Sequence, residues 1–289
     1  MPLIEVRNAS VTYGLGTPYE EKALTDISLS IDGPGFVGII GPTGSGKSTL
    51  IQLMNGLIKP GAGQVLVDGI NLSPLKGQAL RKIRSKVGLV FQYPENQIFE
   101  ETVAREIAYG PKNLGLKKEE IEARIVETLN FVGLDYNEYK DRSPFWLSGG
   151  QMRRVAIASV LSMKPQILIL DEPTAGMDPQ SRRDILDRIA VIQKEWNMTV
   201  VLVSHSMEDI ARLAEKIYVL NKGRLVLEGA PQEVFLKAEL LRSLGLEIPA
   251  MTELMLRLQS RGIRVRTDIF TEQAASEELL KYLKGAGNA

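Results

Sequence analysis

Residues 41–49, with the sequence GPTGSGKST, constrain this chain most strongly, because they match the phosphate-binding loop pattern G-x-x-x-x-G-K-[ST] at every fixed position. The apolar run 35–40 predicts a buried strand before the loop, and residues 48–54 predict a helix after it. In that setting successive backbone N–H groups and the helix N-terminus point at phosphate oxygens. Lys47 is predicted to reach the outer phosphates and Ser48 to bind Mg²⁺. The sequence therefore predicts an α/β protein that binds a nucleotide.

The composition narrows the classes of partner. The chain has 289 residues, 35 Lys and Arg against 35 Asp and Glu, and no cysteine. This balance gives no support for a polyanionic partner, and the absence of cysteine excludes disulfides and thiolate metal sites. The first residues lack the pattern of a secretion signal. The longest apolar runs, such as residues 167–170 and 199–203, are far shorter than the ~20 residues that cross a bilayer. Any role at a membrane is therefore expected to require a partner.

Polar residues follow three further apolar strands. Gln92 follows residues 86–91, Asp171 and Glu172 follow residues 166–170, and His205 follows residues 199–203. The carboxyl ends of parallel strands meet at one edge of a sheet, so these side chains are predicted to converge on the phosphate loop. Adjacent carboxylates after a buried strand are costly unless they serve a cation or a reaction. Asp171 is therefore predicted to hold the Mg²⁺ and Glu172 to orient or deprotonate an attacking water.

The rest of the chain surrounds this core. Alternating residues from 3 to 31 predict antiparallel strands, and Tyr13 between them either stacks on a nucleotide base or is a core aromatic. Residues 94–163 read as an inserted helical lobe that contains the sequence LSGGQ at 147–151. The basic group Arg81, Lys82, Arg84 and Lys86 before it reads as a solvated helix face. Beyond residue 230 the pattern predicts helices at 251–258 and 277–283, with a strand between them at 263–270.

The order and spacing of the phosphate loop, Gln92, LSGGQ, residues 167–172, Asp178 and His205 resemble those of ABC-type ATPases. More narrowly, the segment FQYPENQIF at 91–99 and the C-terminal run LGLEIP at 244–249 are similar to the ATP-binding subunits of energy-coupling factor (ECF) transporters, which take up vitamins and transition metals. The insert GTPYE at 16–20 and the segment SGGQMRRV at 148–155 resemble the second of two paralogous ATPase subunits.

The resemblance implies a phosphate-loop (RecA-like) α/β core with an antiparallel β subdomain, an inserted helical subdomain and a small α+β C-terminal domain. The implied domains are residues 1–230 and residues 231–289, the second of which would help to hold a dimer together. Glu172, His205 and Gln92 would be catalytic, and Ser48, Gln92 and Asp171 would hold Mg²⁺. The nucleotide-binding residues would be Tyr13, Gly41, Pro42, Thr43, Gly44, Ser45, Gly46, Lys47, Ser48 and Thr49.

The resemblance also implies partners. Ser148, Gly149, Gly150 and Gln151 would contact ATP bound to a partner chain, and Asp178 would lie in a loop at the dimer interface. The partner would be a paralogous ATPase subunit or a second copy. An integral membrane coupling subunit and a substrate-binding membrane subunit would complete an importer powered by Mg-ATP, with this chain peripheral at the cytoplasmic face of the cell membrane.

Two other hypotheses fit parts of the sequence. One is an ABC-type ATPase of another importer, or one acting on nucleic acid or ribosomes, and the other is a small-molecule kinase. However, DNA-repair relatives need a long coiled coil between Gln92 and Leu147, and translation-factor relatives carry two cassettes, whereas this chain has one phosphate loop. A small-molecule kinase would share the phosphate loop but leave LSGGQ and His205 without a role.

Overall fold

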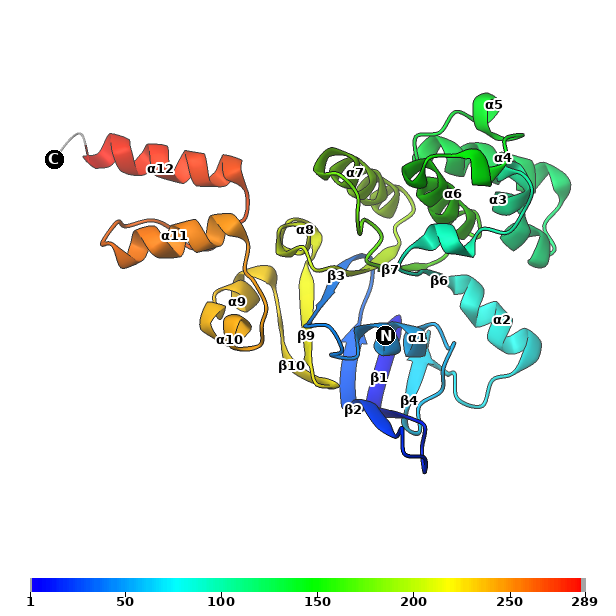
Figure 1. Cartoon of the computed structure of the whole chain (residues 1–289), viewed down its shortest axis with the longest axis horizontal. Helices are drawn as coiled ribbons and strands as arrows, with labels where there is room; N and C mark the ends of the chain where they lie inside the picture. The colour runs from blue at the N-terminus through cyan, green and yellow to red at the C-terminus, as the bar shows by residue number, and fades with distance from the viewer. Residues whose placement is uncertain (1, 287–289) are drawn as a thin grey trace.

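The computed structural model describes residues 2–286 (Figure 1). Residues 1 and 287–289, which belong to the predicted domain ranges, lie outside the described residues. Residues 2–286 form two sheets, and the larger one organises the molecule. Its order is β10-β9-β3-β8-β7-β6. It contains β3 (Gly35–Ile40), β6 (Val87–Val90), β7 (Ile167–Asp171), β8 (Thr199–Val203), β9 (Lys216–Asn221) and β10 (Arg224–Gly229).

Five strands of this sheet are parallel, and only β10 pairs antiparallel, with β9. The register places Asp171 of β7 opposite Val203 of β8, and Ile39 of β3 opposite the same Val203. The carboxyl ends of these strands therefore lie at one edge, as the sequence predicts. Residues 216–221 and 224–229 form a hairpin.

The second sheet is antiparallel and has the order β2-β1-β4-β5. It contains β1 (Ile4–Tyr13), β2 (Glu21–Ile31), β4 (Ala62–Val67) and β5 (Ile70–Asn71). Helix α1 (Lys47–Met54) follows the phosphate loop and packs against this sheet, and α2 (Gly77–Lys86) leads into β6. The predicted antiparallel subdomain is therefore present.

The parallel strands are apolar on both faces because they separate two cores. Leu168 and Leu170 of β7 face the core shared with the helical lobe, whereas Ile167 and Ile169 face the core shared with α1 and the antiparallel sheet. This alternation follows from the two-residue period of a strand, and burial on both faces is what a parallel sheet requires. It explains why residues 166–170 show no polar alternation.

The predicted helical lobe lies between β6 and β7. It contains η1 (Pro94–Gln97), α3 (Val103–Asn113), α4 (Lys118–Phe131), α5 (Tyr136–Tyr139), η2 (Pro144–Trp146) and α6 (Gly149–Leu161). After the lobe, α7 (Pro179–Glu195) follows β7, and α8 (Met207–Leu213) follows β8. Helix α6 begins at Gly149, within the LSGGQ sequence, because the Ser148 side chain caps it.

The C-terminal region differs from its predicted α+β character. In the described residues it consists of α9 (Pro231–Phe235), α10 (Ala238–Ser243), α11 (Ala250–Ser260) and α12 (Glu272–Ala286). The predicted strand at 263–270 is wrong, because side chains satisfy this segment's backbone instead of a sheet. The Thr252 hydroxyl donates to the carbonyl of Ile269 at 2.8 Å, and the Glu278 carboxylate accepts from the N–H of Arg266 at 3.0 Å. Val265 and Ile269 are buried in a small separate cluster with Met255.

Candidate functional site

The phosphate loop connects β3 to α1, and its shape depends on glycine. Gly46 has φ +100°, and a Cβ there would lie 2.7 Å from the carbonyl oxygen of Ala23. A Cβ on Gly41 would lie 2.3 Å from the carbonyl oxygen of Leu220. No residue with a side chain fits either position without moving the backbone. The loop therefore lies directly against β2 and β9.

Lys47 begins α1 and folds back over the loop. Its Nζ donates to the carbonyl oxygens of Gly41 at 2.8 Å and Pro42 at 3.1 Å. The side chain is buried, and this burial lowers the pKa of Lys47, while the carboxylates of Glu172 and Asp171 oppose the shift. The two hydrogen bonds of this buried ammonium go to neutral carbonyl groups, so an anion that binds beside it would compensate its charge.

Ser48 and Asp171 form the second part of the site. The Ser48 hydroxyl donates to Oδ2 of Asp171 at 3.0 Å, although the two residues are 123 positions apart in the sequence. Burial raises the pKa of Asp171. The hydrogen bond from Ser48 and the charges of Lys47 and His205 oppose this shift, while the charge of Glu172 adds to it. A desolvated carboxylate beside a hydroxyl is an arrangement of hard oxygen donors.

Glu172 joins the third part of the site. Its backbone has φ +49°, a conformation uncommon for residues other than glycine, and its N–H donates to the carbonyl of Val203 at 2.9 Å. The turn directs the carboxylate between two partners. Gln92 Nε2 donates to Oε2 of Glu172 at 3.3 Å, and His205 Nε2 lies 2.8 Å from Oε1. The predicted convergence of Gln92, Glu172 and His205 is therefore present.

These groups surround a pocket of about 320 Å³. It is lined by Tyr13, Glu21, Ala23, Thr43, Gly44, Ser45, Gly46, Lys47, Ser48, Thr49, Gln92, Glu172 and His205. Tyr13 lies at its rim, 42% exposed, with its hydroxyl 3.4 Å from Oγ1 of Thr49, so the alternative of a core aromatic is wrong. Glu21 and Ala23 belong to no motif. Glu21 reaches the pocket because it pairs with Tyr13 in the β1–β2 ladder, and Ala23 because its carbonyl lies against Gly46 of the loop.

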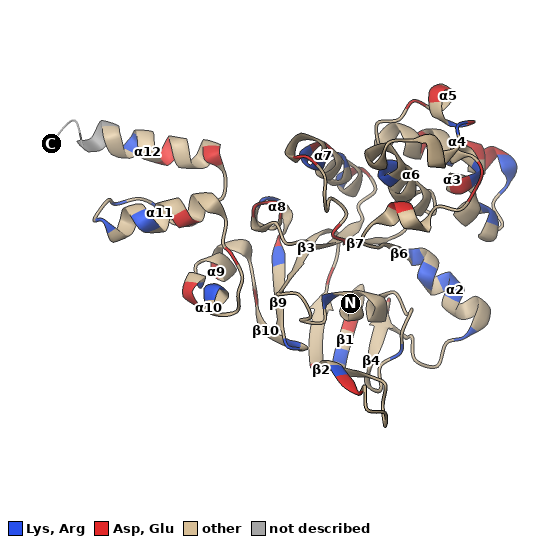
Figure 2. Ribbon diagram, viewed as in Figure 1, with Lys and Arg blue, Asp and Glu red and all other residues tan. Residues whose placement is uncertain are grey.

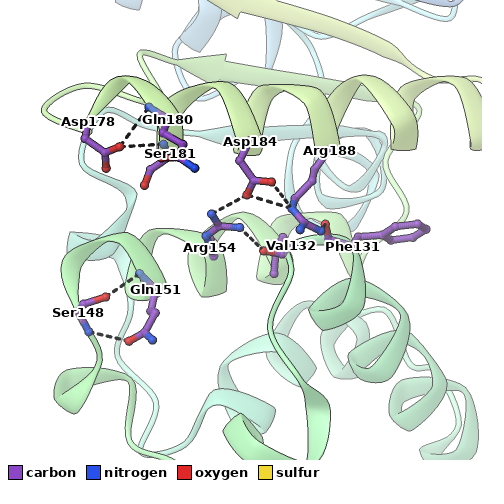
Figure 3. A network of polar contacts seen from close by, with 10 residues as sticks. All are labelled: Phe131, Val132, Ser148, Gln151, Arg154, Asp178, Gln180, Ser181, Asp184 and Arg188. Carbon is purple, nitrogen blue, oxygen red and sulfur yellow. Dashed lines mark hydrogen bonds and ion pairs between the residues drawn. The ribbon is translucent and has the colours of Figure 1, made fainter.

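The LSGGQ segment lies outside this pocket. In the described residues, Ser148, Gly149, Gly150 and Gln151 do not line it. Ser148 and Gln151 form a capping box at the start of α6, with Gln151 N–H donating to the Ser148 hydroxyl at 3.3 Å and Ser148 N–H to the Gln151 amide at 3.0 Å (Figure 3). The capping box uses the N–H groups of Ser148 and Gln151, and the start of α6 at the exposed Gly149 carries the positive end of the helix dipole to the protein surface.

Asp178 caps α7 in the same way. Its carboxylate accepts from the N–H groups of Gln180 at 3.1 Å and Ser181 at 3.0 Å, and these contacts, led by the one to Ser181, hold the pKa of Asp178 below its usual range (Figure 3). Figure 3 shows the capped ends of α6 and α7 at the same side of the view. In this single chain the Asp178 side chain serves a helix cap.

A second cavity, of about 610 Å³, lies between α2, α3 and α6. We call it the lobe groove. It is lined by Arg81, Arg84, Ser85, Gln97, Phe99, Glu106, Tyr109, Gly110, Asn113, Leu114, Ser159, Val160 and Met163. Helix α2 carries Arg and Lys without an acidic residue (Figure 2). It is only partly the solvated face that the sequence predicts, since Arg84 donates to the carbonyl of Gly56 at 2.7 Å and Lys86 pairs with Asp68.

Comparison with known proteins identifies the class first. The model of the ABC transporter family matches residues 24–175. A solved dimeric cassette, MJ0796 in a post-hydrolysis state with ADP and phosphate, is 32% identical with a TM-score of 0.72, covering 79% of this chain and 98% of that one. The structure of cbiO1 from Clostridium perfringens, part of the ABC transporter complex cbiONQ, is 34% identical with a TM-score of 0.74, covering 90% and 97%. The chain belongs to the ABC transporter family and is an ATPase.

Whole-chain relatives narrow the family further. The energy-coupling factor transporter ATP-binding protein EcfA2 of Caldanaerobacter subterraneus subsp. tengcongensis is 53% identical over 99% of both chains. The protein of the same name from Clostridium tetani is 52% identical over 96% of both. The chain therefore belongs to the energy-coupling factor transporter ATP-binding proteins. The predicted family, α/β fold class and ATPase activity are confirmed.

Proposed function

We propose that this chain powers an energy-coupling factor importer for vitamins or transition-metal ions by hydrolysing Mg-ATP. The observation that carries the proposal is one sheet edge at which Lys47, Ser48, Asp171, Glu172 and His205 meet. Whole-chain similarity to ATP-binding proteins of such transporters supports the transport role. The described residues contain no helix long and apolar enough to span a bilayer. We infer a peripheral subunit at the cytoplasmic face of the cell membrane.

The residue types fit Mg²⁺ with a nucleotide. A small hard cation favours a hydroxyl, a carboxylate and an amide oxygen. Ser48 and Gln92 line the pocket, and Asp171 lies directly behind Ser48, whose hydroxyl donates to it. When bound, Mg²⁺ neutralises charge on the phosphate oxygens. Lys47 binds the outer phosphates through Nζ, and the loop N–H groups bind the remaining oxygens. Tyr13 at the rim stacks on the base.

Glu172 is the proposed general base. Its carboxylate is only partly exposed and lies between Gln92 and His205, so it can accept the proton of a water positioned beside the phosphate. His205 donates to the transferred phosphate or to Glu172, and Gln92 orients the water. Because both neighbours hold the carboxylate, little rearrangement is needed for the proton transfer.

The proposed working unit is a pair of ATPase subunits. The donors around Ser148 lie outside the chain's own pocket, which supports their use on the ATP of a partner, either a paralogue or a second copy. Asp178 then lies in the interface loop. Closing the pair around two ATP molecules and opening it after hydrolysis would provide the motion for transport.

The lobe groove is the proposed docking surface for the integral membrane coupling subunit, which in turn contacts a substrate-binding membrane subunit. Phe99 and Tyr109 are exposed at its rim and pack edge to face at 4.8 Å between ring centroids. Arg84 Nε and Gln97 Nε2 are buried in the described structure without a hydrogen-bond partner. These two donors are buried and closed to a docking partner, whereas the exposed aromatics beside them suit an apolar partner segment.

A soluble role on nucleic acid or ribosomes is the second candidate, and no observation favours it. Purifying the tagged chain from its native membranes in mild detergent separates the two. We expect a polytopic membrane protein and a second ABC-type ATPase to be recovered together with it. Recovery of ribosomes or DNA without any membrane protein would contradict the transport role and leave the ATPase chemistry intact.

A further inference from the structure

Arg153 is a buried charge to which no motif assigns a role. It lies on α6, five residues after Ser148, and is 6% exposed. Its guanidinium forms a two-pronged pair with Glu95, with Nε–Oε2 at 3.1 Å and Nη2–Oε1 at 2.9 Å. The remaining Nη1 donates to the carbonyl of Ala175 at 2.6 Å. All three guanidinium nitrogens are therefore used.

Each partner of Arg153 belongs to a different part of the proposed machinery. Glu95 lies in η1, three residues after Gln92, and Gln97 of the same short helix lines the lobe groove. Ala175 lies in the turn between Glu172 and Asp178, and its N–H donates to the carbonyl of Glu172 at 3.1 Å. The guanidinium is thus two hydrogen bonds away from the backbone of the proposed base. Arg153 itself does not line the nucleotide pocket.

The chemistry of this contact is specific to arginine. The planar guanidinium holds Glu95 with two parallel bonds and still directs a third donor at Ala175, whereas the Lys ammonium is a point charge without a fork. The pair is largely desolvated, with 7% and 22% of the two side chains exposed. Bidentate contacts of this kind set the relative position of the segments that they join.

Arg154, the next residue, provides an internal contrast. It pairs with Asp184 at 2.8 Å and donates to the carbonyl of Val132 at 2.6 Å (Figure 3). These contacts hold α6 to α7 and to the end of α4. They do not involve the segments around Gln92 and Glu172. Arg154 therefore has the same charge on the same helix with only a packing role, although its side chain is 16% exposed against 7% for Arg153.

We propose that Arg153 is a positioning residue for ATP hydrolysis. It ties η1, the helix that begins with LSGGQ and the turn after Glu172 into one unit, so that a displacement at the lobe groove moves the base and the partner-facing end of α6 together. The inference rests on the proposed function, since it presumes that Glu172 is the base and that the groove receives the coupling subunit.

The test uses the full complex purified from membranes and steady-state ATPase kinetics. Arg153→Lys and Glu95→Gln are each expected to lower kcat about tenfold, while KM for ATP changes less than about twofold. This pattern is expected because the variants lose the coupling between sites and keep the groups that bind ATP. Because both changes break one unit, the double variant is expected to be no slower than the slower single variant. Arg153→Lys and the control Arg154→Lys are expected to lower Tm by similar amounts. The control should nevertheless leave kcat unchanged.

Three results would overturn the inference. One is a kcat within twofold of wild type in both Arg153→Lys and Glu95→Gln. Another is an equal loss of kcat in Arg154→Lys, which would reduce the effect to helix packing. The third is independent, additive losses in the double variant. A Glu172→Gln complex that hydrolyses ATP at the wild-type rate would instead refute the proposed function, and this inference with it.

Discussion

At the scale of single residues, the site contains ionisable side chains whose charged forms are disfavoured by burial. Burial lowers the pKa of Lys47 and raises that of Asp171, so the protein without nucleotide maintains an ammonium and a carboxylate in a poorly solvated cleft. Glu172 adds an uncommon backbone conformation. Such features concentrate where a ligand or a reaction uses them. Mg-ATP is expected to relieve the first two by supplying opposite charges.

Replacing Asp171 with Asn tests this view through stability. Without nucleotide, Asn avoids the buried charge and still accepts from Ser48, so we expect Tm to rise at neutral pH by about 2–4 °C, the change expected for about 1 kcal/mol. The folded protein binds the proton of the Asp171 carboxyl more tightly than the unfolded chain, in which the pKa of this group is 3.8. The contribution of Asp171 to the free energy of unfolding should therefore fall as pH rises from 3.8 through its folded pKa.

Calorimetry at a series of pH values checks this expectation. The Tm difference between the variant and wild type should be full above the folded pKa of Asp171 and should shrink toward zero near pH 3.8. Mg-ATP should raise Tm in wild type and much less in Asp171→Asn. A variant that is less stable than wild type at neutral pH without nucleotide would show that the Asp171 charge is well compensated in the protein itself.

Glu172→Gln tests the proposed base. Gln keeps the size of the side chain and can still bond to its neighbours, but it cannot accept a proton at neutral pH. We expect ATP affinity to stay near wild type and kcat to fall by at least about 100-fold. The exposed Glu195→Gln on α7 is the matched control and should leave kcat unchanged. Turnover near the wild-type level in Glu172→Gln would mean that another group takes the proton.

At the scale of elements, the sequence predicted those helices, strands and turns that short-range patterns specify. The strand, loop and helix from residue 35 to 54 follow the sequence, because glycine positions and apolar runs act within a few residues. The strand expected at 263–270 fails for a different reason. Apolar alternation at Val265 and Ile269 requires only a buried face, and here α11 and α12 supply it, while Thr252 satisfies part of the backbone.

The lobe groove permits a prediction about docking. Tyr109 is 46% exposed on α3, at the rim of the groove. Placing a charge there with Tyr109→Asp should remove apolar contact area and disfavour an apolar partner segment. We expect at least about a tenfold lower recovery of the membrane subunit in the purification, with ATP binding by the chain unchanged.

The control places the same charge elsewhere. Val191→Asp on α7, where the wild-type side chain is 53% exposed, should leave the recovery of the membrane subunit as in wild type. Equal recovery with Tyr109→Asp and wild type would place the membrane contact outside the groove. Loss of recovery with both variants would indicate a general effect of added charge.

At the scale of the whole molecule, the boundary of the C-terminal region depends on the criterion. Packing places it at a later residue than composition does. Composition changes at residue 231, but Val234, Phe235 and Leu241 of α9 and α10 are buried in the main core. Only α11, α12 and the segment between them have a cluster of their own. Figure 1 shows these two helices side by side, at the opposite end of the molecule from the helical lobe.

We propose that this pair of helices contributes to dimerisation, because α12 exposes Leu280 at 52% and Leu283 at 63%. Replacing both with Glu should lower the dimer fraction without nucleotide, measured by sedimentation at fixed concentration, by at least about fivefold. Replacing Glu277 and Lys281 of the same helix with Gln is the control, since it leaves the apolar positions intact. A dimer fraction equal to wild type in the leucine variant would refute this role.

The sequence by itself determined the class of this protein. The phosphate loop, LSGGQ and the polar residues that follow apolar strands, Gln92, Asp171 and His205, are local patterns, and their order along the chain is enough to indicate an ABC-type ATPase. The convergence of the strand ends also follows from sequence, because parallel strands have only one carboxyl edge.

Only the tertiary structure decided which groups touch. The bond from Ser48 to Asp171 spans 123 positions, and that from Arg153 to Glu95 spans 58. The rim position of Tyr13 and the pocket contacts of Glu21 and Ala23 likewise depend on how the antiparallel sheet lies over the loop. No local pattern encodes such pairs, because they form only when packing brings distant elements together and removes their charges from water.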